Sequence, residues 1–471
     1  MAATSFIAAI EIGSSKISGI VGEKNGDGSI TIKSYAEEDS QDIIRKGIPY
    51  NLDKTTDCLT SLINKLEENL DPGIEQVYVS IGGQSLHAKK NSITVQLDKQ
   101  TIVSKELVSS IIKENIQKEY SELDILTVVP QEYKLGSDYQ VDPVGVATTK
   151  IEGNFLNVVA KSSFKKSLIH CFKEADITIA DILVNPIANA NVILSNSDKR
   201  KGCALIDLGA ETTTISVYRD NLLRFLAVLP LGGRSITKDI MSLGVEEHEA
   251  EELKRNYIEV GLDMNHLEED EDRARTKYEL SDGRSIEVDQ LNEIAQARAQ
   301  EIVENVWNLM QLAKQDSNLL AGIFLIGGGA NLNGIDAVFK KTTKIQRITA
   351  IKKPTLTIHT TTKLPTDGVS FSLIGNIYLG DKNCCKEQPK PAEDGQGELF
   401  TPKEVAKEQE NIEVEVKVDP PIEPKTTKGK EKKDHKKKSG GMMVGLTDMF
   451  QTLQGHIFPD NNEDKKPKNN N

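Results

Sequence analysis

The chain has 471 residues, of which 38% are hydrophobic, so it is long enough for two or three domains with a sizeable core. Its formal net charge of -13 argues against nucleic acid as the main partner, because binding phosphates requires a basic surface. Five cysteines without a CxxC pair argue against a zinc site or a disulfide framework and favour a reducing, cytoplasmic compartment. No apolar run approaches the roughly 20 residues of a transmembrane helix.

Two segments far apart in the sequence share one pattern. Each has an apolar strand, an acidic residue, an apolar residue, a glycine, a short polar turn and a second strand. The first reads FIAAIEIGSSKISGIV over 6–21, and the second reads CALIDLGAETTTISVY over 203–218. The repetition predicts two related halves, each opening with a β-hairpin.

Helices and strands alternate after the first hairpin. We expect a helix over 53–69 with Asp53 as its N-cap, because Leu59, Leu62, Ile63 and Leu66 recur at helical spacing. The next elements in chain order are a strand over 75–83, a helix over 104–118, strands within 123–160, a helix over 163–175 and the strand ITIADIL.

A long helix is predicted over 289–315, and a strand, three glycines and a further helix follow it. The residues expected on the buried side of the long helix are Leu291, Ile294, Ile302, Val306, Leu309 and Ala313. Alternating strands and helices predict α/β layers.

The composition changes after about Leu379. Residues 381–441 are rich in Lys, Glu and Pro and poor in large apolar side chains, so we expect a disordered linker that includes Cys384 and Cys385. Residues 442–458 are apolar again and are followed by a polar tail over 459–471.

The apolar residues of 442–458 recur every three or four positions, which predicts an amphipathic helix. This segment is too short and too polar to span a bilayer, so we expect the helix to lie flat on a membrane, with the lysines of the linker adding attraction to anionic lipids. Packing on the protein's own core or on a partner is the alternative. The predicted membrane-binding residues are Met442, Met443, Leu446, Met449, Phe450, Leu453, Ile457 and Phe458.

The two hairpin turns carry the residues with chemistry. In the second, Asp207 ends a buried strand and Gly209 frees the turn. The next four residues, Ala210, Glu211, Thr212 and Thr213, present N–H groups and hydroxyls that can cradle phosphate oxygens. A carboxylate in this place can hold Mg²⁺ through water. The first turn has the matching residues Glu11, Gly13, Ser14, Ser15 and Lys16. One copy alone would favour an ordinary β-hairpin, but two copies favour a phosphate site.

Glycines mark two further close approaches of the backbone. Gly232 and Gly233 precede a predicted helix, and the run Gly327, Gly328, Gly329 and Ala330 follows a predicted strand. The GxGxxG dinucleotide fingerprint is absent. Glu251 and Lys254 lie three apart on one helix face, a pattern that by itself favours a solvated ion pair.

The order of these motifs resembles the actin-like ATPase superfamily, and the spacing within 232–255 and the strand 77–86 resemble the FtsA family. The resemblance implies an α/β fold of two related halves around a nucleotide cleft, joined by helices near 182–194 and 369–380. It implies ATP held with Mg²⁺ by the two hairpin turns, the Gly232 and Gly327 turns, Glu251 and Lys254, with Asp207 reaching the metal through water. Glu11 stands where most of the superfamily has Asp, which suits slow hydrolysis.

The resemblance also implies a role in cell division. Such a protein polymerises on the cytoplasmic side of the inner membrane at the septum, anchors FtsZ filaments and helps recruit other divisome proteins, and it is not a metabolic enzyme. The implied domains are a first half over 1–83 and 163–199, an inserted subdomain over 84–162, and a second half over 200–380. Within the second half, 235–310 receives the C-terminal peptide of FtsZ. A pilus-assembly actin homologue and a small-molecule kinase are the alternatives.

Overall fold

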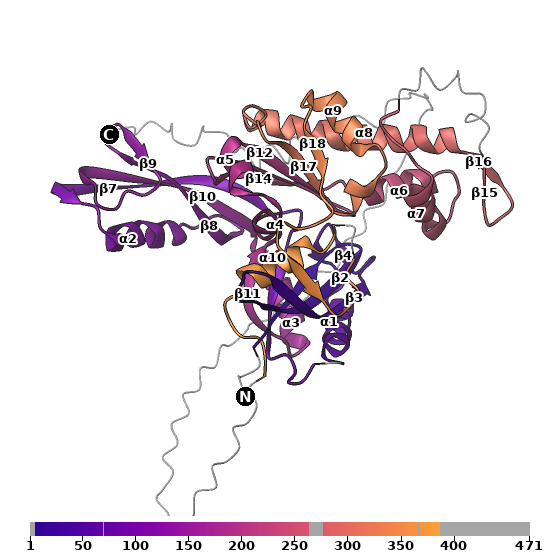
Figure 1. Cartoon of the computed structure of the whole chain (residues 1–471), viewed down its shortest axis with the longest axis horizontal. Coiled ribbons are helices and arrows are strands. Elements are labelled where there is room, and N and C mark those ends of the chain that lie inside the picture. Colours follow the sequence, from indigo (N-terminus) through magenta and orange to yellow (C-terminus); the bar gives the residue numbers. More distant parts are fainter. Residues whose placement is uncertain (1–4, 69, 263–276, 366–367, 387–471) are drawn as a thin grey trace, which may run out of the picture. The chain divides into compact units, whose positions relative to one another are not determined.

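A computed structural model of the chain describes residues 5–68, 70–262, 277–365 and 368–386, and the structural statements below concern these ranges (Figure 1). Most strands belong to two sheets, one of six strands and one of nine. No helix in the described ranges is long and apolar enough to cross a bilayer.

The six-stranded sheet is built around the mostly buried central strands β1 and β6. In spatial order it contains β11 (Thr178–Val184), β6 (Gln76–Ile81), β1 (Ile7–Ile12), β2 (Lys16–Lys24), β3 (Ile30–Asp39) and β19 (Ile358–Thr360). Helices cover both faces, because Gly19 of β2 packs against Leu62 and Leu66 of α1 (Leu52–Glu67), whereas Gly22 packs against Ile377 of α10 (Phe371–Leu379). The α3 helix (Ser162–Glu174) packs beside α1.

The nine-stranded sheet contains the second hairpin. In spatial order its strands are β18 (Ile348–Ala350), β17 (Gly322–Ile326), β12 (Cys203–Leu208), β13 (Thr213–Arg219), β14 (Leu222–Leu229), β7 (His87–Ile102), β10 (Ala147–Lys161), β8 (Leu123–Leu135) and β9 (Asp138–Gln140). The associated helices are α5 (Asn196–Lys201), α6 (Gly233–Met241), α7 (Glu247–Asn256), α8 (Val288–Leu312) and α9 (Ile335–Thr343). Two short strand pairs complete the set, β4 (Ile44–Arg45) with β5 (Ile48–Pro49) and β15 (Lys277–Glu279) with β16 (Ser285–Glu287).

The two sheets share a five-strand topology. The first contains the run β3-β2-β1-β6-β11 and the second contains β14-β13-β12-β17-β18. In each run the first three strands are antiparallel and the last two are parallel to the hairpin's first strand. The prediction of two related halves is therefore confirmed. Helices α4 (Asn185–Ile193) and α10 pack together, and a Cβ on Gly375 of α10 would lie 2.4 Å from the Ala188 carbonyl oxygen of α4.

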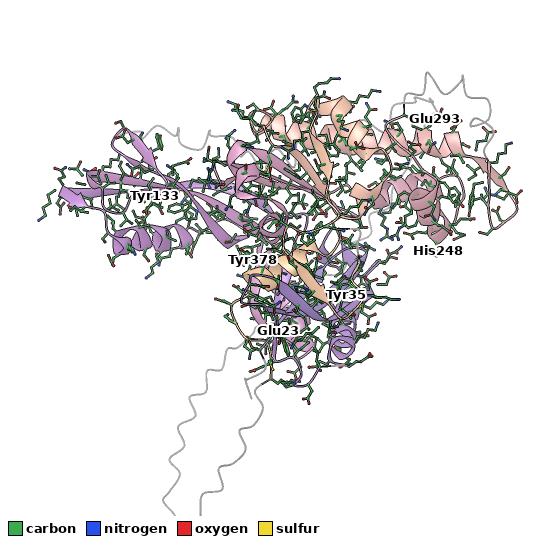
Figure 2. The ribbon with its side chains drawn as sticks, in the orientation of Figure 1. Glu23, Tyr35, Tyr133, His248, Glu293 and Tyr378 are labelled. Carbon is green, nitrogen blue, oxygen red and sulfur yellow. The ribbon has the colours of Figure 1, made fainter. Side chains whose placement is uncertain are left out.

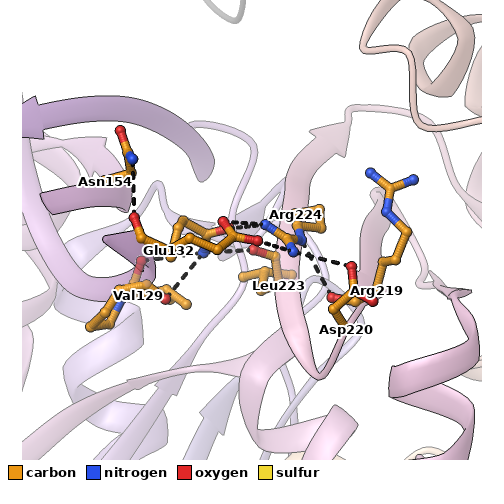
Figure 3. Close-up of polar contacts among 9 residues, drawn as sticks. Val129, Glu132, Asn154, Arg219, Asp220, Leu223 and Arg224 are labelled. Carbon is orange, nitrogen blue, oxygen red and sulfur yellow. Dashed lines mark hydrogen bonds and ion pairs between the residues drawn. The ribbon is translucent and has the colours of Figure 1, made fainter. Parts of the chain in front are cut away.

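Residues 87–161 leave the first sheet and extend the second. Ala227 of β14 pairs with His87 of β7, and β10, β8 and β9 continue the sheet, with α2 (Lys105–Ile116) packed on β7. A polar cluster reinforces this junction (Figure 3). The Arg224 guanidinium donates two hydrogen bonds to the Glu132 carboxylate, one of them 2.9 Å long, and Gln131 donates to the Leu223 carbonyl at 3.1 Å. A separate core of Val103, Ile111, Tyr133, Leu135, Ile151 and Phe155 fills this region.

Two details of the helices differ from the predictions. Helix α1 begins at Leu52, because the Asn51 side chain accepts the Lys54 amide at 3.1 Å and the Asn51 backbone is extended. The prediction of Asp53 as N-cap is therefore wrong, and Asp53 lies in the first turn. Of the residues predicted on the buried side of α8, Ile294 and the C-cap residue Ala313 are only half-buried, whereas the other four are buried.

The chain stays packed beyond α10. The amide of Cys384 donates to the Phe6 carbonyl at 2.8 Å, its carbonyl accepts from Glu75 at 2.8 Å, and Lys386 donates to Gly73 at 2.9 Å. The Tyr78 hydroxyl accepts the amides of Asp381 at 2.9 Å and Lys382 at 2.8 Å. We call residues 381–386 the exit seam. The expectation that the linker begins at 381 is wrong for the exit seam, because both cysteines are buried there.

Candidate functional site

The turns of the two hairpins meet at one cavity of about 1070 Å³. Nearly all of the predicted nucleotide-binding residues line it, namely Glu11, Gly13, Ser14, Ser15, Lys16, Asp207, Gly209, Ala210, Thr212, Gly232, Gly233, Glu251, Lys254, Gly327, Gly328 and Gly329. The remaining three, Glu211, Thr213 and Ala330, lie beside these residues in the chain but are not part of the cavity wall. His248 of α7, labelled in Figure 2, lines the wall as well.

Glu11 reaches the cavity from the end of β1. Its carboxylate accepts a hydrogen bond from Asn185 Nδ2 at 2.8 Å and another from the Ser372 hydroxyl. Burial raises the pKa of Glu11 to about 7, and the nearby charge of Asp207 adds to this rise against the lowering effect of Ser372. The first carboxylate is thus poised between its protonated and ionised forms near neutral pH.

Asp207 occupies the equivalent place at the end of β12. Its Oδ2 accepts a hydrogen bond from Asn189 Nδ2 at 3.3 Å, and burial raises the pKa of Asp207 to about 6. Two carboxyl groups whose ionised forms are disfavoured by burial make a site that a divalent cation would stabilise. Within the described ranges, no group of three or more His, Cys, Asp or Glu side chains is arranged as a metal site.

The two turns close in the same way. The Gly13 amide donates to the Lys16 carbonyl at 3.1 Å, and the Gly209 amide donates to the Thr212 carbonyl at 2.9 Å. Lys16 extends its ammonium to Glu37 at 2.7 Å, so its charge is shared with a carboxylate at the cavity wall. Backbone geometry therefore repeats between the turns, whereas only the first one carries a lysine.

Glycine at 327 is required by two independent features of the site. Its φ of 82° is in the left-handed region, and a Cβ there would lie 2.3 Å from Asp207 Oδ1 and 2.7 Å from the Leu208 carbonyl oxygen. The absence of a side chain lets the turn after β17 press against the second carboxylate. Gly328 and Gly329 follow on the wall, where they leave backbone exposed to a ligand.

Glu251 and Lys254 pair with each other at the cavity, and Lys254 is only 14% exposed. The Lys254 ammonium also donates to Thr237 Oγ1 at 2.9 Å and to the Gly233 carbonyl at 3.3 Å. Burial lowers the pKa of Lys254, with Glu251 opposing this effect. The interpretation of this pair as a solvated helix face is therefore wrong, because α7 packs on α6 and encloses the lysine.

Comparison with known proteins supplies the family. The family model described as "Cell division protein FtsA" matches residues 204–368, and that described as "Type IV pilus assembly protein PilM" matches 138–266. The cell division protein FtsA of Porphyromonas gingivalis is 30% identical over 338 residues, which cover 71% of this chain and 70% of that protein. The chain belongs to the FtsA family. FtsA of Neisseria meningitidis is 26% identical over 333 residues, or 70% of this chain and 80% of that protein.

A solved structure agrees with this FtsA-family assignment at the level of the fold. The PilM-PilN type IV pilus biogenesis complex contains a chain with a TM-score of 0.54 and 14% identity, covering 79% of this chain and 97% of that one. This FtsA-family chain has the actin-like fold and is an actin-like cell division protein.

The sequence analysis missed several cavity residues of this FtsA-family chain, and four of them contact the predicted site residues. Asn185 and Asn189 of α4 donate hydrogen bonds to the two carboxylates, and their spacing of four on one helix face was a usable signal. Ser372 and Arg234 carry no such signal, because each is a single polar residue whose partner lies far away in sequence.

A nucleotide with Mg²⁺ fits these residues. Among the described residues, Asn189 Oδ1 and Arg234 Nε are buried without a hydrogen-bond partner. Asn189 lies at the cavity on α4, the helix that contacts both Glu11 and Asp207. The wall combines glycine-lined backbone, two carboxyl groups and the Lys16 and Lys254 ammonium groups, and the volume is close to the upper end of the range for small-ligand sites.

Proposed function

We propose that this chain binds ATP with Mg²⁺ in the cavity, polymerises at the cytoplasmic face of the inner membrane at the septum, anchors FtsZ filaments there and helps recruit other divisome proteins. The observation that carries the proposal is the meeting of two equivalent hairpin turns, with Glu11 and Asp207, at one cavity of an FtsA-family chain.

Each group has a distinct task in this proposal. The turns at Gly13 and Gly209 contact phosphate oxygens, Asp207 and Glu11 hold the waters of Mg²⁺, and Lys254 and the Gly327 turn contact the nucleoside. When bound, Mg²⁺ would neutralise phosphate charge and favour the ionised form of both carboxyl groups. Hydrolysis is at most slow, and the nucleotide governs closure of the halves and the polymer state rather than metabolism.

Calorimetry tests the nucleotide site. Asp207→Asn should weaken ATP binding strongly in Mg²⁺ and little in EDTA, because the neutral amide no longer attracts the hydrated cation. Glu251→Ala should show a smaller dependence on Mg²⁺. The parent chain failing to bind ATP while folded would contradict the proposal.

The segment 84–162 is proposed as the subdomain that contacts the neighbouring protomer. Its separate hydrophobic core supports the idea that it is a distinct unit. Deleting it with a short linker should abolish filaments seen by electron microscopy, while ATP binding stays measurable. Filaments of parental length would refute this assignment.

The region 235–310 is proposed to receive the C-terminal peptide of FtsZ. It contains α7 and most of α6 and α8, and a short peptide docking on helices is a known recognition mode. FtsZ lacking its C-terminal peptide should lose co-sedimentation with this protein. Full co-sedimentation of the truncated FtsZ would show that the contact lies elsewhere.

The membrane anchor is proposed to be the amphipathic segment 442–458, which lies outside the described residues. Many weak tails on one filament would attach it by avidity. Leu446→Asp with Phe450→Asp should abolish flotation with anionic vesicles although every lysine remains, whereas Thr447→Asp on the polar face is the matched control. Flotation of the double variant at the parental level would exclude this helix as the anchor.

A further inference from the structure

We propose that the Lys46 amide, Glu211 and Arg234 form a latch between the two halves beside the cavity, which holds the halves closed and must open before nucleotide can exchange. The part concerning nucleotide rests on the proposed function.

The central contact of the latch joins the two halves directly. Lys46 lies in the turn between β4 and β5, and its amide donates to Glu211 Oε2 at 2.7 Å. Glu211 belongs to the second hairpin turn, and its side chain is only 15% exposed. A hydrogen bond from an amide to a half-buried carboxylate is among the stronger neutral-to-ion contacts in proteins.

Arg234 holds Glu211 from the other side. Its Nη1 lies 3.6 Å from Glu211 Oε1, its Nη2 lies 2.9 Å from Glu247 Oε1, and the side chain is 13% exposed. Its amide also donates to the Ala210 carbonyl at 2.7 Å, so backbone and side chain both fix α6 to the second turn. The Arg234 charge offsets the negative charge of Glu211, which lies in the turn that is proposed to bind phosphates.

The Lys46 turn is itself fixed to the first hairpin. The Gly47 amide donates to Ser14 Oγ at 2.8 Å, and Ser14 is buried in the first turn. A Cβ on Gly47 would lie 2.8 Å from the Gly83 Cα, so this turn is closely packed as well. A continuous chain of contacts therefore runs from the first turn through Lys46 and Glu211 to Arg234.

A second cross-cleft contact is much weaker. Arg234 Nη2 lies 3.6 Å from Asp42 Oδ1, but the Asp42 side chain is 79% exposed. Exposed ion pairs are screened by water and salt and contribute little. The latch thus depends on Glu211. Two other carboxylates that pair with Arg234 provide matched controls: Asp42 belongs to the first half and Glu247 belongs to the second half.

The test measures the separation of the halves without nucleotide. Spin labels are placed by Thr60→Cys on α1 and Lys341→Cys on α9 in the full chain with Cys58→Ser, since both sites are exposed and the other four cysteines are buried. Glu211→Ala should shift the distance distribution to longer values. Glu211→Gln and Arg234→Gln should give intermediate shifts, and Asp42→Asn and Glu247→Gln should match the parent.

Release of a fluorescent ATP analogue gives the second readout, and Glu211→Ala should accelerate it about tenfold. If the distances shift but the parent binds no analogue, the latch stands and the ATP proposal fails. If Glu211→Ala and Glu211→Gln both fold, by circular dichroism, and keep the parental distances, the latch is refuted whatever the nucleotide result. Should Glu211→Ala not fold, Glu211→Gln and Arg234→Gln decide by the same criterion.

Discussion

Replacing Gly375 by Ala should destabilise the protein by forcing α4 and α10 apart. The new Cβ would lie 2.4 Å from the Ala188 carbonyl oxygen and 2.6 Å from its carbon, both backbone atoms that cannot rotate away. Ordinary contact begins near 3.4 Å, so the helices must separate by about 1 Å. Overpacking of this kind costs about 1–3 kcal/mol, while Ala in place of Gly within a helix returns about 1 kcal/mol. Because the nearest clashing atoms are backbone, we take the upper part of the overpacking range, about 2–3 kcal/mol, and expect a net loss of about 1–2 kcal/mol.

Urea unfolding at 25 °C measures this loss, with Gly26→Ala as control because no atom lies within 4 Å of its added Cβ. The control should stay within about 0.5 kcal/mol of the parent. The same movement would lengthen the hydrogen bond from Ser372 of α10 to Glu11, so ATP binding should weaken with stability. An unchanged or higher urea midpoint for Gly375→Ala would show that α4 and α10 can move apart without loss of stability, and it would refute the reasoning.

Three further changes follow from contacts in the structure. Burial raises the pKa of Glu11 from 4.5 to about 7, so the contribution of protonated Glu11 to stability is full below pH 4.5 and is lost as pH rises to 7. The urea midpoint of the nucleotide-free protein should therefore fall between pH 5 and 8, and Glu11→Gln should flatten this fall. A parental slope in the variant would contradict this. Arg224→Ala should speed hydrogen exchange in β8 and β14 by leaving Glu132 unpaired, while Arg219→Ala, whose guanidinium points away in Figure 3, should not. Tyr78→Phe should cost about 1–3 kcal/mol by removing the hydroxyl that accepts hydrogen bonds from the amides of Asp381 and Lys382, and tryptic cleavage at Lys382 no faster than in the parent would oppose it.

The sequence repeat was sufficient to predict the two halves. An acidic residue and a glycine at the end of an apolar strand mark a hairpin turn locally, and the structure shows the same strand order following each copy. Helix positions were also predictable, because apolar spacing reports a buried face. The N-cap of α1 was misplaced by two residues, since Asn51 and Asp53 are both suitable caps and only backbone geometry chooses Asn51.

The pairing of strands far apart in the chain could not be predicted from the sequence. Residues 87–161 follow β6 of the first sheet, yet His87 pairs with Ala227 and the segment extends the second sheet. No local pattern encodes that choice, which depends on packing between segments more than a hundred residues apart. The burial of Lys254 was hidden for a similar reason, because a charged helix face is enclosed only once α6 packs against it.

The exit seam determines how tension on the C-terminal region would enter the molecule. Cys384 is hydrogen-bonded to Phe6, at the start of β1, and the far end of that six-residue strand carries Glu11. A pull on the chain beyond Lys386 would therefore load the seam's hydrogen bonds to Phe6, Gly73 and Glu75. The force would reach the strand whose other end is about 20 Å away at the cavity. Shortened chains meant to preserve this mechanical connection should end no earlier than Lys386.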